Sequence, residues 1–278
     1  MTEVKLGHWK KVPTAILNII IINVIVFVAQ QIIAGTNGRA NVTNVLALHY
    51  FADDDFRWWQ LFTHWFCHGS VQHILGNMVM LWFFGNKIEN LMGSKKFIII
   101  YCISGVGATL LHVGLLHYEY SGIENLVTTF NLSPTQVRFN TIYTKYLSSE
   151  VFNNTYLVAN NLAISWLNDP FNPQFIPEAK ELVNSVLANA TKGITLGASG
   201  CVCGVLGAFG YLFPNDRVYG YLPFGIKYVL PLILIAEIYY GAFYSNGTNV
   251  AHFAHAGGIV FGILAAWLFN KFNKKDFY

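Results

Sequence analysis

Six apolar segments recur along the chain, and each is free or nearly free of charged residues. A helix that crosses a membrane needs about 20 apolar residues, because each residue adds about 1.5 Å and the hydrocarbon core is about 30 Å thick. The segments that reach or approach this length are 12–34, 71–84, 97–116, 196–213, 226–244 and 250–269. The pattern therefore predicts an all-α membrane protein built on a bundle of six transmembrane helices.

The second and fourth segments, 71–84 and 196–213, are shorter than a full crossing. A helix at either place is expected to start below the membrane surface, at the end of a loop that dips into the bilayer. Irregular backbone is tolerated at that depth only where it adjoins protein or water, because hydrocarbon cannot satisfy its polar groups.

The stretch between the third and fourth segments, residues 117–195, mixes polar and apolar side chains and is rich in asparagine. Pro177 followed by Glu178 is typical of a helix start. An apolar stripe at helical spacing follows, formed by Leu182, Val183, Val186 and Leu187. We expect a small, partly helical extracytoplasmic insert here, with disorder as the alternative. The chain then divides at 1–116, 117–195 and 196–278 within one membrane domain.

The composition fits a chain that faces water over only a small part of its surface. Apolar residues make up 54% of the chain and charged residues 11%, whereas soluble domains carry about 25% charged residues. The net charge of +3 comes without a long basic run, so no nucleic-acid partner is expected. The expected surroundings are the lipid bilayer of the cell membrane.

Lysine and arginine residues indicate the orientation, since loops on the cytoplasmic side are enriched in them. An inside N-terminus places most of the 17 basic residues inside. These are Lys5, Lys10, Lys11, Lys87, Lys95, Lys96, Arg217, Lys227, Lys271, Lys274 and Lys275. The longer outside segments hold Arg39, Arg57, Arg138, Lys145, Lys180 and Lys192. Both termini are therefore expected to be cytoplasmic.

Four polar side chains fall at a similar depth in this arrangement. His73 and Asn77 lie near the start of the second segment, Ser199 near the start of the fourth and His255 near the start of the sixth. All three segments enter from the outside. Polar groups inside a bilayer are costly, so each is a candidate functional residue.

The chemistry of these side chains is complementary. A serine becomes a nucleophile when a neighbouring base accepts its proton, and histidine is the usual base. His73 and Asn77 are four residues apart and share one helix face, where an imidazole and an amide can donate to an oxyanion. The N–H of Ser199, at a helix N-terminus, is a third donor.

Small residues at four-residue spacing occur on the fourth and sixth segments. They are Gly200, Gly204 and Ala208 on the fourth, and Gly258 and Gly262 on the sixth. Such faces let two membrane helices approach closely, and close approach is what a hydrogen bond between Ser199 and His255 requires. Helix packing without chemistry is the alternative for this spacing.

Three short motifs occur in order on the second, fourth and sixth segments. Residues 197–200 read GASG, residues 254–262 read AHAGGIVFG, and residues 68–78 read HGSVQHILGNM, followed by LWFFG at 81–85 and Glu89. Together they resemble the nucleophile motif, the histidine motif and the second-helix H-x-x-x-N signature of the rhomboid family of intramembrane proteases. The motifs and the six segments cover most of the chain outside 117–195.

The resemblance implies an intramembrane serine endopeptidase that cleaves transmembrane-anchored proteins near the outer membrane face. Ser199 would be the nucleophile and His255 the general base and later the general acid, in a dyad without an aspartate partner. The implied oxyanion and substrate-binding residues are His73, Asn77, Gly197 and Gly200. The active site would open to the extracytoplasmic side, and neither a cofactor nor a metal is implied.

Three features depart from the family pattern. The first outside loop of many members has a Trp-Arg pair, where this chain reads Trp58-Trp59-Gln60. An aromatic residue that stacks on the histidine is often found four residues after the nucleophile, where this chain has Cys203. The stretch 117–195 is also much longer than in minimal members.

Three other functions compete with this reading. A catalytically inactive rhomboid-like protein would bind and escort membrane clients, although such relatives usually lack the serine or the histidine. A small transporter is supported mainly by Glu237 inside the fifth segment, whose simplest interpretation is a neutral or hydrogen-bonded carboxyl within the bundle. A metal site would draw on the histidine-rich set His64, Cys67, His68, His73, His252 and His255.

Overall fold

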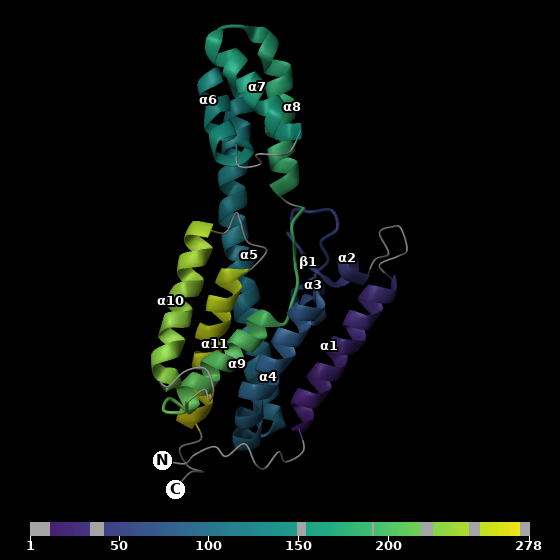
Figure 1. The fold of residues 1–278 in the computed structure, drawn as a ribbon, viewed down its shortest axis with the longest axis vertical. Coiled ribbons are helices and arrows are strands. Elements are labelled where there is room, and N and C mark those ends of the chain that lie inside the picture. The colour runs from purple at the N-terminus through teal and green to yellow at the C-terminus, as the bar shows by residue number, and fades with distance from the viewer. Residues whose placement is uncertain are drawn as a thin grey trace. The chain divides into compact units, whose positions relative to one another are not determined.

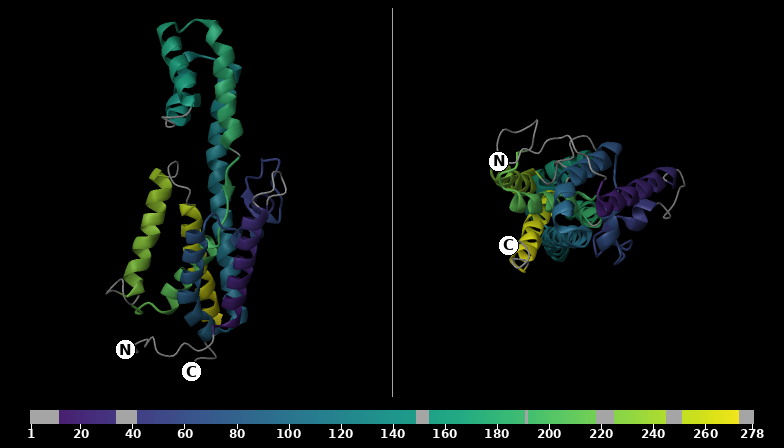
Figure 2. Two further views of the ribbon diagram at one scale, coloured as in Figure 1. Left: turned by 45° about the vertical axis from the view of Figure 1, so that its right-hand side comes forward. Right: turned by 90° about the horizontal axis from the view of Figure 1, so that it is seen from below.

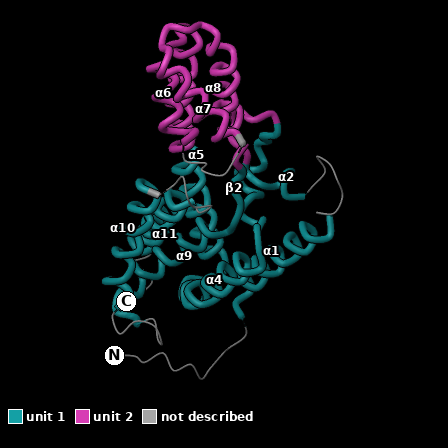
Figure 3. The backbone as a smooth tube through the Cα atoms, turned by 45° about the horizontal axis from the view of Figure 1, so that its top comes forward, with its two compact units in different colours: residues 1–48, 55–113, 194–278 teal, residues 49–54, 114–193 magenta. Residues whose placement is uncertain are grey.

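The computed structural model describes residues 12–33, 42–148, 154–190, 192–217, 225–244 and 251–272, which are mostly helical (Figure 1). The described chain forms two compact units (Figure 3). Unit 1 comprises Met1–Leu48, Asp55–Val113 and Ile194–Tyr278, and unit 2 comprises His49–Asp54 and Gly114–Gly193. The first eleven residues and the last six, which hold several of the basic residues used for orientation, lie outside the described part.

The main helices of unit 1 correspond to the six apolar segments. They are α1 (Thr14–Ile33), α4 (Val71–Met92), the first part of α5 (Ser94–Leu132), α9 (Ser199–Leu212), α10 (Ile226–Tyr244) and α11 (His252–Phe272). The short elements before α4 are α2 (Val42–Leu46), β1 (Leu48–His49), α3 (Gln60–Thr63) and the 3-10 turn η1 (His64–Phe66). A second short strand, β2 (Ile194–Thr195), pairs with β1 and leads into α9. The helix α9 packs against α4, α10 and α11 (Figures 1 and 2).

Four of the described helices, namely α1, α5, α10 and α11, are long and apolar enough to cross a membrane. The helix α9 is shorter, as the sequence predicted. The predicted ends of the second and third segments were wrong: α4 continues past residue 84 to Met92, and α5 continues past residue 116 to Leu132. The extensions stay helical because they too have a buried side, which includes Ile88 on α4 and Phe130 on α5.

Unit 2 has a core of its own. The second part of α5 packs there with α6 (Gln136–Ile142), the π-helical turn η2 (Tyr143–Leu147), α7 (Asn154–Asn168), the 3-10 turn η3 (Pro173–Phe175) and α8 (Ile176–Ala190). Aromatic rings of Phe130, Phe139 and Trp166 fill its centre. The helix predicted at Pro177 is confirmed, and it buries Leu182 and Val183 of the predicted stripe. The stretch 117–195 is thus mostly helical rather than partly so.

Glycines set the distance between α9 and α11 in unit 1. A Cβ atom on Gly258 would overlap the carbonyl oxygen of Gly200, and one on Gly262 would overlap that of Gly204. A Cβ atom on Gly204 would overlap Ser104 of α5. The backbones therefore touch along this seam, which fits the small-residue spacing of the sequence.

The carboxylate of Glu89 holds the start of α1. It is 4% exposed and accepts hydrogen bonds from the backbone N–H groups of Ala15 (2.8 Å) and Ile16 (3.0 Å) and from the Ser94 hydroxyl (2.6 Å). The first N–H groups of a helix have no acceptor within the helix, and a negative charge there interacts favourably with the helix dipole. This contact joins α1 to the end of α4.

We predict that Glu89→Gln lowers the stability of the fold by about 1–3 kcal/mol, because the carboxamide turns an N–H donor toward the donors of α1. Thermal unfolding in detergent measures the change. Glu181→Gln, at an exposed position on α8, is the matched control and should leave the midpoint within about 1 °C of wild type. Equal shifts for both variants would contradict the capping role.

Candidate active site

The N-terminal ends of three helices carry the predicted site residues. Ser199 is the first residue of α9, while His73 and His255 lie in the first turns of α4 and α11. Ser70 caps α4 by accepting a hydrogen bond from the N–H of His73 (3.1 Å), which places the imidazole at the start of that helix. The glycine seam brings the corresponding end of α11 to α9.

Ser199 and His255 are in direct contact. The Nε2 atom of His255 lies 2.8 Å from the Oγ atom of Ser199, within the range of a strong hydrogen bond. The histidine is only 14% exposed. This is the geometry in which an imidazole can take the proton of a serine hydroxyl.

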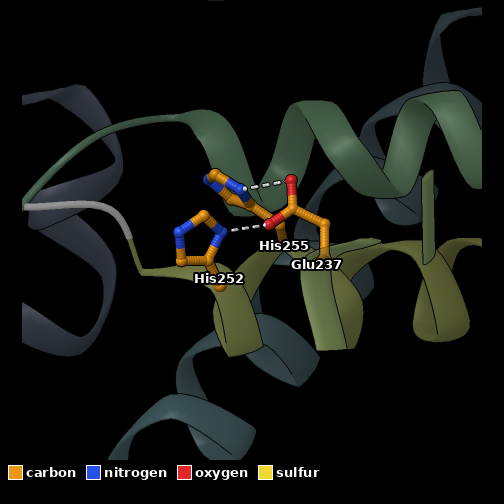
Figure 4. A group of neighbouring side chains, drawn as sticks. All are labelled: Glu237, His252 and His255. Atoms are coloured by element: carbon orange, nitrogen blue, oxygen red, sulfur yellow. Dashed lines mark hydrogen bonds and ion pairs between the residues drawn. The ribbon is translucent and has the colours of Figure 1, made fainter. Parts of the chain in front are cut away.

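His255 also contacts an acidic side chain, a glutamate, where the resemblance implied no aspartate partner. The Glu237 carboxylate on α10 accepts hydrogen bonds from Nδ1 of His255 (3.1 Å) and from Nδ1 of His252 (2.7 Å), as Figure 4 shows. From the sequence, Glu237 was interpreted as a neutral or hydrogen-bonded carboxyl within the bundle, without a named partner. Nothing in its spacing from the histidines, 15 and 18 residues away, indicated the contact.

The histidines proposed as a metal set are divided in the structure. Ligand atoms of Glu237, His252 and His255 lie within 4.8 Å of one another, which is compatible with a divalent cation. His64 instead donates a hydrogen bond from Nδ1 to the carbonyl of Gln60 (2.6 Å). His68 bonds Asn77.

Gly197 fits tightly between His73 and the serine. Its φ of +125° favours glycine, and a Cβ atom there would lie 2.8 Å from the Nε2 atom of His73 and 3.8 Å from the Ser199 Oγ. The N–H of Gly197 donates to the carbonyl of His64 (2.9 Å). A side chain at residue 197 would therefore collide with the imidazole of His73.

Asn77 and Gly200, the other predicted site residues, have partners of their own. The Nδ2 atom of Asn77 lies 3.0 Å from Nε2 of His68, so one amide N–H donates to that ring and a second N–H remains on the same nitrogen. A Cβ atom on Gly200 would lie 2.6 Å from the Cβ atom of Ala108. Gly200 thus serves helix packing, and its N–H sits at the unbonded start of α9.

The loop that lacks the family's arginine is anchored by Gln60. This side chain is fully buried; its Nε2 donates to the carbonyls of Asn44 (3.3 Å) and Asp55 (3.1 Å), and its Oε1 accepts from the N–H of Arg57 (3.0 Å). An uncharged amide therefore supplies both donor and acceptor for the loop. At the departure from the family pattern, Trp58-Trp59-Gln60, the glutamine thus holds the loop by hydrogen bonds.

A model of the rhomboid domain matches residues 55–135 and 177–272, more than half of the chain. The chain belongs to the rhomboid family. Members of this family are generally intramembrane serine proteases. The match and the apolar helices make this rhomboid a multi-pass membrane protein.

Two buried histidines of this rhomboid should make its stability sensitive to acid. Burial lowers the pKa of His64 to about 4, and burial together with the nearby His73 lowers the pKa of His68 to about 4. An unfolded histidine titrates near about 6.5. The unfolded state therefore binds more protons below that pH, so the stability present above about pH 6.5 is lost progressively toward about pH 4.

We predict that the thermal unfolding midpoint in detergent decreases as the pH is lowered from 7 to 4.5. In His68→Gln the midpoint should decrease less steeply, because a neutral amide replaces one titrating ring. Circular dichroism melts at several pH values measure both. A midpoint that rises on acidification, or the same slope in both proteins, would contradict the prediction.

Proposed function

We propose that this rhomboid is an intramembrane serine endopeptidase in which Ser199 is the nucleophile and His255 the general base. The observation that carries the proposal is the 2.8 Å contact between Ser199 Oγ and His255 Nε2. The proposed substrates are transmembrane-anchored proteins, cut near the outer membrane face. The helix α9 supports this depth because it is too short for a full crossing.

The first chemical step forms an acyl-enzyme. The Ser199 Oγ attacks the scissile carbonyl carbon while its proton passes to Nε2 of His255, and the carbonyl electron pair moves onto the oxygen. Collapse of this intermediate breaks the C–N bond, and His255 gives the proton to the leaving amine. Water, deprotonated by His255, then hydrolyses the ester.

The oxyanion requires donors that are in place before the reaction. The N–H groups of Ser199 and Gly200 at the start of α9, the ring of His73 and the second amide N–H of Asn77 are the proposed donors. The closeness of Gly197 to both His73 and the Ser199 hydroxyl supports this assignment. Gly197 and Gly200 have no side chains and therefore leave room at the site.

The substrate must present an extended backbone. Backbone groups in a helix are already hydrogen-bonded, so a transmembrane helix has to unwind locally before the serine can attack it. Family resemblance suggests small or helix-breaking residues around the cleaved bond.

A client-binding protein without catalysis is the other candidate, and it does not require an assembled pair. The Ser199–His255 hydrogen bond and the carboxylate on the far side of the imidazole favour hydrolysis.

We predict that a fluorophosphonate probe labels the detergent-solubilised wild type and that Ser199→Ala and His255→Ala abolish labelling, since the probe needs an activated serine. Ser165→Ala, which removes an exposed serine on α7, is the control and should label as wild type does. A folded wild type that resists labelling would contradict the proposal and favour the client-binding protein.

We further propose that the chain crosses the membrane six times, through the six main helices of unit 1 with the loop before the short α9 completing its crossing, and that the site is open to the extracytoplasmic side. A membrane-impermeant maleimide applied to intact cells should then modify Ser165→Cys and spare Asn90→Cys at the end of α4, relative to the wild-type background. Modification of Asn90→Cys alone would indicate the opposite orientation. Modification of both variants would contradict the six crossings.

A further inference from the structure

Glu237 is an acidic side chain next to the proposed catalytic pair, and a reaction carried out by a serine and a histidine does not by itself require it. It lies in the middle of α10 and is only 20% exposed. Both of its oxygen atoms are used, Oε1 by His255 and Oε2 by His252. Figure 4 shows the carboxylate facing the two imidazole rings of α11. A charged group is costly at such a place unless it is paired, so the two contacts account for its presence.

The carboxylate decides which nitrogen of His255 carries the proton. An ionised carboxylate only accepts hydrogen bonds, so the 3.1 Å contact requires a proton on Nδ1. The neutral ring then has a lone pair on Nε2, the atom that lies 2.8 Å from the Ser199 hydroxyl. The opposite tautomer would point an N–H at the serine and could not accept its proton.

The same carboxylate also opposes the charge that forms during the reaction. When Nε2 takes the serine proton, the ring becomes an imidazolium with two N–H groups. A negative charge about 3 Å from Nδ1 stabilises that cation, and it does so more strongly in a partly desolvated bundle than in water. The carboxylate itself need not take up the proton.

His252 restrains the carboxylate from the other side. Its Nδ1 donates to Oε2 at 2.7 Å, and its ring stacks on Tyr240 with centroids 5.7 Å apart and planes 27° apart. Tyr240 belongs to the same helix as Glu237. With both oxygens bonded, the carboxylate cannot rotate away from His255 without breaking a second hydrogen bond.

We propose that Glu237 is a positioning residue for His255, so that this rhomboid works through a Ser199–His255–Glu237 triad in which His252 fixes the carboxylate. The inference rests on the proposed function, since it assigns the group that prepares its base. Other titratable groups that interact electrostatically with this set are His73 on α4, His112 on α5 and Cys203 on α9.

The first test reads the tautomer directly and needs no activity. Nitrogen NMR of protein labelled with ¹⁵N-histidine distinguishes Nδ1–H from Nε2–H rings, and the His255 signal is assigned by its loss in His255→Ala. We expect Nδ1–H in the wild type and a mixture or the Nε2–H form in Glu237→Gln, because a carboxamide can either accept from Nδ1–H or donate to Nδ1. An Nε2–H tautomer in the folded wild type would overturn the proposal.

The second test measures kinetics. We expect Glu237→Gln to lower kcat for a transmembrane substrate on the order of 100-fold with KM within about threefold, since the change acts on the base and not on substrate binding. His252→Gln should lower kcat by about tenfold or less, because Glu237 keeps its bond to His255. Glu89→Gln is the matched control: the same substitution at another buried glutamate should lower stability and keep kcat within about threefold.

The outcomes separate the two proposals. If the wild type cleaves and Glu237→Gln cleaves as fast, the positioning role is overturned while the protease remains. If the wild type is inert, the protease fails, and the NMR measurement still decides the tautomer. If EDTA abolishes fluorophosphonate labelling of the wild type and added Zn²⁺ restores it, the positioning role is overturned, and Glu237, His252 and His255 are assigned to a metal instead. Labelling unchanged by EDTA is the expected result.

Discussion

The contact between the backbones of α9 and α11 is the constraint on which the rest of the site depends. Glycine carbonyls of α9 lie where any side chain on Gly258 or Gly262 of α11 would collide. Only at that separation can two short side chains, Ser199 and His255, meet at 2.8 Å. Glycines without side chains along the seam thus let the two helices approach, and this brings two polar atoms together at its end. The apolar core on either side packs against the helices and holds them in place.

Around this seam several buried polar side chains hydrogen-bond to irregular backbone, whose polar groups hydrocarbon cannot satisfy. The amide of Gln60 ties the loop before α4, the carbonyl of His64 receives the N–H of Gly197, and Gln30 of α1 accepts the N–H of His68 through its Oε1 (3.0 Å). These bonds connect irregular backbone to the residues that precede Ser199. They keep that backbone satisfied where water is scarce.

The sequence was informative where a single helix decides the outcome. The lengths of the apolar segments located the helices, and the residues at their starts were placed well enough to bring His73, Ser199 and His255 into one region. It was wrong about where α4 and α5 end, because continuation depended on neighbours that bury Ile88 and Phe130. It interpreted Glu237 as a neutral or hydrogen-bonded carboxyl within the bundle, but it did not identify the two histidines that contact it.

What the sequence determined by itself was the set of apolar helices, the serine and histidine motifs, and the family they indicate, since each of these is written in spacing along one segment. Only the tertiary structure decided that Gln60 anchors the loop before α4, that Asn77 donates a hydrogen bond to His68, and that Glu237 contacts the Nδ1 side of His255. The physical reason is that a hydrogen bond depends on the distance and angle between atoms of different elements. Two residues on separate helices reach that geometry only after the helices have packed.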